Sequence, residues 1–107
     1  MKQPEAIKEY QQLILKMLQA QGLPRVGAKI ISEAFTEPEE LSMEELAERT
    51  DYSLATVSNT ARNLEMMKVI ERVRKPGSKK IYIRPKRDFI SDFEQKMKLV
   101  HETKMSM

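Results

Sequence analysis

The chain has 107 residues, of which 40% are hydrophobic and 33% are charged, with 19 lysines and arginines against 16 acidic residues. This length and composition predict one globular domain over residues 1–107 and exclude a disordered or low-complexity polypeptide. The chain has no cysteine, which excludes disulfides, zinc–thiolate sites and thiol catalysis. Its single histidine, His101, cannot by itself form a histidine-rich metal site, so neither a metal nor a cofactor is expected.

The sequence favours a cytoplasmic protein without catalytic activity. The first residues lack the apolar core of a secretory signal, and the longest apolar runs are too short to span a bilayer, so no membrane partner is expected. It contains no phosphate-binding loop, nucleophile–base pair or metal-binding cluster. An enzyme is therefore the weaker hypothesis, and no catalytic residue is assigned.

Two helices are predicted in the N-terminal part, within residues 4–36. Pro4 suits a first helical position, and apolar residues follow it at three- and four-residue spacing. Gly22 ends this helix, and Pro24 begins a second one that runs to about Phe35. The first helix is apolar over more than one face, which predicts that it packs against more than its own domain.

A helix–turn–helix is predicted over residues 42–67. Ser42 and Glu45 have the spacing of a capping box, so the first helix of the pair begins there, and it ends near Thr50. Ser53 has the chemistry of an N-cap for the second helix, which is expected from Leu54 to Met67. The residues expected to face the core are Val57, Ala61 (or Thr60), Leu64 and Met67.

After the helix pair, the hydrophobic period changes to that of strands. Two β-branched segments joined by a Pro-Gly turn predict a hairpin over residues 69–84, while Leu41-Ser42 is too short for more than a stub of strand. A last helix is expected over residues 88–105. The fold class is therefore mostly α with a small β-hairpin, a winged helix-turn-helix flanked by N- and C-terminal helices.

The second helix of the pair has the composition of a DNA-reading helix. The side opposite its predicted core face carries small or polar residues and few carboxylates. Asparagine can pair with the adenine edge, arginine with guanine, and a threonine methyl with the thymine methyl, while Ser53 and Ser58 suit phosphate contact. The candidate DNA-binding residues are Ser53, Ala55, Thr56, Ser58, Asn59, Arg62 and Asn63.

The charges are segregated along the chain. From Lys68 to Arg87 there are nine basic residues and one acidic residue, whereas from Glu33 to Asp51 there are eight acidic residues and one basic residue. Binding to a polyanion through counterion release needs such clustering rather than a high overall charge. The positive cluster coincides with the predicted wing.

Several segments together resemble the MarR superfamily of winged-helix regulators, in particular its GbsR-like branch. They are Gly22-Leu-Pro-Arg-Val-Gly27, Leu41-Ser-Met-Glu-Glu-Leu-Ala-Glu48, Ser53-Leu-Ala-Thr-Val-Ser58 with Arg62, Leu64 and Glu65, and the basic hairpin. The resemblance covers residues 22–84. It implies a sequence-specific, double-stranded DNA-binding transcriptional regulator that acts as a homodimer, with Thr56, Ser58, Asn59 and Arg62 facing the major groove and Arg74, Lys75, Lys79 and Lys80 as wing contacts on the backbone or minor groove.

The resemblance and the wide apolar faces of the terminal helices both favour a dimer formed by those helices. The expected interface residues are Ile7, Ile14, Met17, Leu18, Phe89, Phe93 and Met97. Lys68 stands where the superfamily usually has a glycine, which predicts a differently built corner between the helix and the wing.

Two questions stay open in the sequence. The alternative function is a winged-helix protein–protein interaction module in a larger assembly, which would use the basic hairpin for an acidic partner. A small-molecule effector is also open: the resemblance suggests a quaternary ammonium compound, which would need an aromatic cage, but no such cage can be assembled from the sequence.

Overall fold

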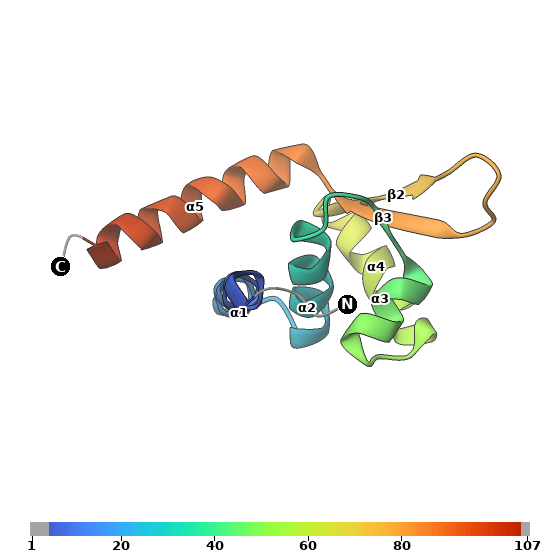
Figure 1. The fold of residues 1–107 in the computed structure, drawn as a ribbon, viewed down its shortest axis with the longest axis horizontal. Coiled ribbons are helices and arrows are strands. Elements are labelled where there is room, and N and C mark those ends of the chain that lie inside the picture. Colours follow the sequence, from blue (N-terminus) through green and yellow to red (C-terminus); the bar gives the residue numbers. More distant parts are fainter. Residues whose placement is uncertain (1–4, 106–107) are drawn as a thin grey trace.

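The computed structural model describes the fold of residues 5–105 and the side chains of residues 5–99 (Figure 1). Within this range it has five helices and three short strands. In chain order they are α1 (Glu5–Ala20), α2 (Arg25–Phe35), β1 (Leu41–Ser42), α3 (Met43–Thr50), α4 (Leu54–Met66), β2 (Ile70–Arg74), β3 (Ile81–Pro85) and α5 (Arg87–Met105). The mostly helical winged-helix fold predicted from the sequence is confirmed.

The sheet has three antiparallel strands in the order β1-β3-β2, rather than the two strands of the predicted hairpin. The strand stub Leu41-Ser42 pairs with β3, with Leu41 opposite Ile83 and Ser42 opposite Tyr82. A two-residue strand has no hydrophobic period of its own, so only its position beside β3 reveals it. The pair Arg74–Ile81 closes the β2–β3 hairpin, which leaves residues 75–80 as the wing loop.

The helix–turn–helix begins as its caps predict. The Ser42 hydroxyl accepts from the Glu45 amide at 3.0 Å, and the Glu45 carboxylate accepts from the Ser42 amide at 3.1 Å, which completes the capping box. Hydrogen bonding to the Ser42 backbone holds the pKa of Glu45 below its ordinary value, so this cap is intact at neutral pH. The core faces of α3 and α4 are thereby directed at α2 and the sheet.

The end of α4 differs from the prediction, because Met67 does not face the core. Its side chain is 57% exposed, and the buried position is taken by Val69. The chain turns at Lys68, which has a φ of 63°. The Lys68 amide donates to the Glu65 carbonyl and the Val69 amide to the Leu64 carbonyl, both at 3.0 Å, which is a Schellman motif. The corner therefore has the left-handed geometry that favours glycine, although it is formed by a lysine.

This left-handed lysine leads to a stability prediction. Replacing Lys68 with glycine is expected to raise the free energy of unfolding by about 1 kcal/mol, because a side chain is strained at this φ. Urea denaturation followed by circular dichroism measures the change. Lys79→Gly is the matched control, since Lys79 is an exposed lysine without a positive φ and should gain nothing. Equal changes in the two variants would contradict the explanation.

α5 joins the rest of the fold through an aromatic cluster. Phe35 of α2 packs edge-on against Phe89 and Phe93 of α5, with ring centroids 5.8 and 5.4 Å apart. Beyond this cluster α5 extends away from the sheet (Figure 1). The wing loop and the α3–α4 turn lie at the opposite end of the molecule from the C-terminus of α5 (Figure 1). The long dimension of the molecule is 50 Å.

Candidate nucleic-acid interface

α4 has one core face and one polar face. Val57, Ala61 and Leu64 are buried, and they recur every three or four residues. On the remaining surface of the helix, the structure places the predicted DNA-binding residues as follows: Ser53, Ala55, Asn59, Arg62 and Asn63 are exposed, while Thr56 and Ser58 are half-buried. The first turn contains no acidic residue, so no carboxylate there would repel a phosphate.

Ser53 is used by the helix itself. Its hydroxyl oxygen accepts from the Thr56 amide at 3.1 Å, and its hydroxyl donates to the Thr56 side-chain oxygen at 2.9 Å. These bonds satisfy one free amide of the first turn and orient the half-buried Thr56 side chain. Ser53 therefore starts the helix and positions Thr56, in addition to any contact with a phosphate.

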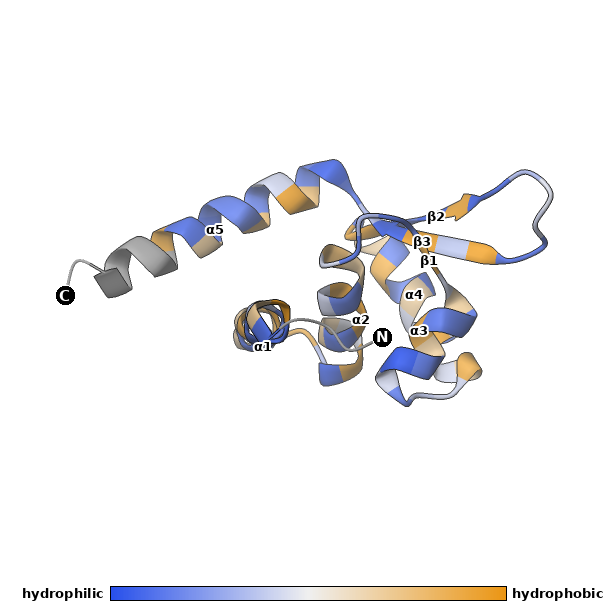
Figure 2. Ribbon diagram, viewed as in Figure 1, coloured by the Kyte–Doolittle hydropathy of each residue, from blue (hydrophilic) through white to orange (hydrophobic). Residues whose placement is uncertain are grey.

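The predicted wing residues fall into two groups. Arg74, Lys79 and Lys80 are exposed, and the described residues provide no ion pair for them. Lys75 is half-buried: its ammonium lies 3.6 Å from a Glu40 carboxylate oxygen and 4.3 Å from the centre of the Tyr82 ring. The wing loop carries no hydrophobic residue and is coloured blue to white in Figure 2.

Carboxylates from other elements neutralise part of the basic cluster. Arg72 pairs with Glu65 of α4 at 3.0 Å, and Arg84 pairs with Glu71 across the hairpin at 2.6 Å. Glu40, in the segment before β1, lies 3.6 Å from Arg84 as well as from Lys75. A count of charges along the sequence missed the pairs made by Glu40 and Glu65, because these two residues lie outside the basic segment and reach it only in the folded protein.

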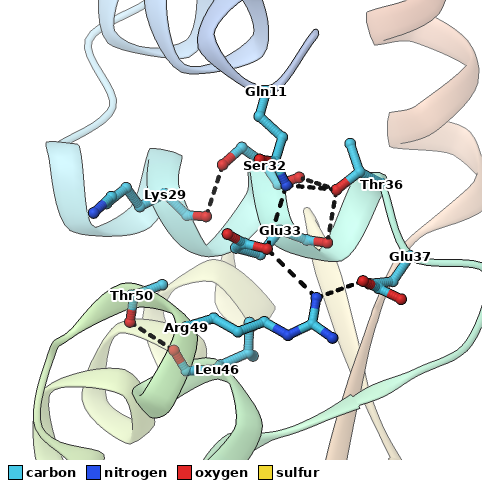
Figure 3. A network of polar contacts seen from close by, with 9 residues as sticks. All are labelled: Gln11, Lys29, Ser32, Glu33, Thr36, Glu37, Leu46, Arg49 and Thr50. Atoms are coloured by element: carbon cyan, nitrogen blue, oxygen red, sulfur yellow. Dashed lines mark hydrogen bonds and ion pairs between the residues drawn. The ribbon is translucent and has the colours of Figure 1, made fainter. Parts of the chain in front are cut away.

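A polar network connects α1 to the helix–turn–helix (Figure 3). Gln11 of α1 donates to Thr36 at 2.8 Å and to Glu33 at 3.3 Å. Arg49 of α3 lies 3.6 Å from Glu33 and donates a hydrogen bond to Glu37, which raises the pKa of its guanidinium. Arg49, the one basic residue between Glu33 and Asp51, thus binds the carboxylates of Glu33 and Glu37 and fixes α3 against α2.

The residues predicted at a dimer interface have contacts within a single chain. Ile14, Leu18, Phe93 and Met97 are buried and belong to the core of the protomer. Ile7, Met17 and Phe89 are half-buried and therefore retain surface that a second copy could cover. The structure gives the first four a role inside one chain; the role of the whole set between chains stays a prediction.

A cavity of about 550 Å³ lies between α1, the 37–40 segment, the sheet and the start of α5. Tyr10 and Phe35 are its aromatic lining residues. Burial and the nearby Glu94 raise the pKa of Tyr10, so its hydroxyl is protonated at neutral pH. The acidic lining residues are Glu37, Glu39, Glu40, Glu71 and Glu94, against two arginines, Arg84 and Arg87.

The described part of the chain has no group of three or more His, Asp or Glu side chains placed to hold a metal ion. Among the described helices, none has the length and hydropathy needed to cross a membrane.

Comparisons with known proteins complete the description of the fold. No family model and no curated protein match this chain. Among solved structures, a transcriptional regulator is 26% identical, with a TM-score of 0.69 over 79% of this chain and 58% of that one. A mutant of MepR from S. aureus bound to an oligodeoxyribonucleotide is 20% identical, with a TM-score of 0.70 over 92% of this chain and 73% of that one. Wild-type MarR from E. coli is 14% identical, with a TM-score of 0.64 over 89% of this chain and 75% of that one.

The fold is that of the MarR-family winged-helix regulators. This confirms the fold that the resemblance implies, while membership of the superfamily and of its GbsR-like branch stays a prediction. The chain spans 58% of the length of the first regulator, so the activities and partners of the full-length relatives enter only as proposals.

Proposed function

We propose that the protein is a sequence-specific, double-stranded DNA-binding transcriptional regulator that acts as a homodimer. α4 enters the major groove, and the wing contacts the phosphate backbone or the minor groove. The observation that carries this proposal is the pairing of an exposed polar face on α4 with exposed wing cations that have no ion pair among the described residues.

Each part of the proposed surface has a separate task. Asn59, Arg62 and Asn63 carry groups that can read base edges, and Thr56 adds a methyl group. Arg74, Lys79 and Lys80 supply charge for phosphates, which dominates affinity without specifying sequence. Lys75 contributes less, because Glu40 and Tyr82 already occupy its ammonium. In a homodimer, two copies of this surface would meet half-sites about one helical turn apart.

Solved neighbours support the proposal at the level of the fold. A structure titled as a MepR–DNA complex from S. aureus is 20% identical to this chain, with a TM-score of 0.64. The same framework therefore exists in a protein bound to DNA. The alternative function, a protein–protein interaction module, predicts that random duplex DNA does not bind or binds without dependence on salt.

Lys79→Ala tests the phosphate part of the proposal. The variant is expected to bind every duplex more weakly and to reduce the slope of log K against log salt by about 1, since one phosphate contact is lost. Fluorescence anisotropy with a labelled random duplex at several salt concentrations measures both quantities. The control is Lys16→Ala, which removes an equal charge from an exposed position on α1 and should leave the slope unchanged. Equal slopes for Lys79→Ala and the wild type would contradict a wing contact.

A further inference from the structure

Leu54 is a large apolar residue left exposed at the first position of α4. Its side chain is 49% exposed, whereas every third or fourth residue after it on the core face is buried. Single exposed leucines are common and by themselves need no explanation. Leu54 differs from an ordinary surface leucine in its location, because it lies at the N-terminal end of the helix proposed to read DNA, where side chains reach base edges.

The helical spacing aligns Leu54 with a predicted base-reading residue. Leu54, Ser58 and Arg62 are four residues apart and form one row along α4. Ala55, Asn59 and Asn63 form the neighbouring row with the same spacing. The first row runs from the edge of the core face at Leu54, three residues before the buried Val57, to the exposed Arg62 on the polar face. At the N-terminal end of α4, the exposed Leu54 and Ala55 give the helix an apolar surface beside its polar face.

The chemistry of the major groove supplies a partner for this apolar surface. Thymine is the base that presents a methyl group in the major groove, and apolar side chains recognise it there by contact. Exposure to solvent gives a leucine side chain no favourable free energy. Contact with a thymine methyl group buries apolar area on both the leucine and the base, which is favourable. The first turn of α4 holds no acidic residue, so phosphates can approach closely enough for this contact.

We propose that Leu54 is a specificity-determining residue that contacts the 5-methyl group of a thymine in the bound duplex. The proposal rests on the DNA-binding function proposed above and deepens it, because it names the base feature read by one residue. Leu54 was not among the binding residues predicted from the sequence. From the sequence, an aliphatic residue in the first turn of a helix is assigned to the core, and only the structure shows that Leu54 is exposed.

The test removes the methyl group from the DNA and the side chain from the protein. A duplex is first selected from a random pool with the wild-type protein, and each thymine is then replaced singly by uracil, which lacks the methyl group but pairs identically with adenine. At one thymine, the replacement should weaken wild-type binding roughly fourfold, the value expected for one buried methyl group. In Leu54→Ala the same replacement should have no further effect.

Met66→Ala is the matched control, since Met66 is a 76% exposed apolar residue at the other end of the same helix. It should retain the fourfold effect of the wild type. The proposal is overturned if no thymine responds, if the response survives in Leu54→Ala, or if Leu54→Ala changes the sedimentation of the DNA-free protein, which would place Leu54 in a protein contact. A wild-type protein that binds no duplex at all would instead refute the proposed function.

Discussion

Ile83→Ala is expected to lower the free energy of unfolding by about 2–5 kcal/mol, the range for removing a fully buried aliphatic side chain. Ile83 is 1% exposed and lies in the middle of β3, the central strand, opposite Leu41 on one side and Arg72 on the other. Its side chain belongs to the core cluster shared by the helices and the sheet. Loss of this side chain leaves a cavity into which the surrounding core side chains relax only in part.

Chemical denaturation followed by circular dichroism measures this loss. Ile81→Ala is the matched control: it removes the same atoms from a half-buried position two residues earlier on the same strand. We expect it to cost about 1–2 kcal/mol, in proportion to the smaller apolar area that it buries. Equal losses at the two positions would mean that β3 is not the centre of the packing. The free energy of unfolding of a small domain is typically about 5–15 kcal/mol, so the loss expected for Ile83→Ala is a large fraction of the total.

Arg62→Ala is expected to relax the sequence preference at one base-pair position by about 1–3 kcal/mol, which is roughly a 5-fold to 150-fold loss of discrimination. Arg62 is exposed on the polar face of α4, and no ion pair with another described residue restrains it. Its guanidinium can therefore donate two hydrogen bonds to a guanine edge. Selection from a random pool with each protein, followed by sequencing, measures preference position by position.

Arg25→Ala provides the control, since Arg25 is an exposed arginine at the start of α2 and should leave every position unchanged. The comparison with Lys79→Ala is decisive for the proposed division of tasks. A base contact lowers preference at one position, whereas a phosphate contact lowers affinity for all sequences alike. Uniform weakening by Arg62→Ala would reassign Arg62 to the backbone.

The candidate site was predictable where its determinants are local. The Ser42–Glu45 capping box and the Ser53 cap could be identified from residues three positions apart, and the structure contains both. The core face of α4 follows from its hydrophobic period up to Leu64. The period failed at Met67, because it assumes that the helix continues, whereas Lys68 adopts a left-handed conformation and turns the chain.

The sequence by itself determined the order and type of the elements and the location of the basic cluster. Caps, glycines, prolines and hydrophobic periods act within a few residues, and their physical effect does not depend on the rest of the chain. They were sufficient to predict a winged helix with a polar face on α4.

Only the tertiary structure decided which of these residues are available to a partner. Glu40 and Glu65 approach Lys75 and Arg72 from other elements, and β1 finds its place beside β3, although no sequence pattern joins these segments. Exposure of Leu54 is a property of the same kind. Ion pairing, strand pairing and burial depend on distances in space, and those distances are set when the whole core has packed.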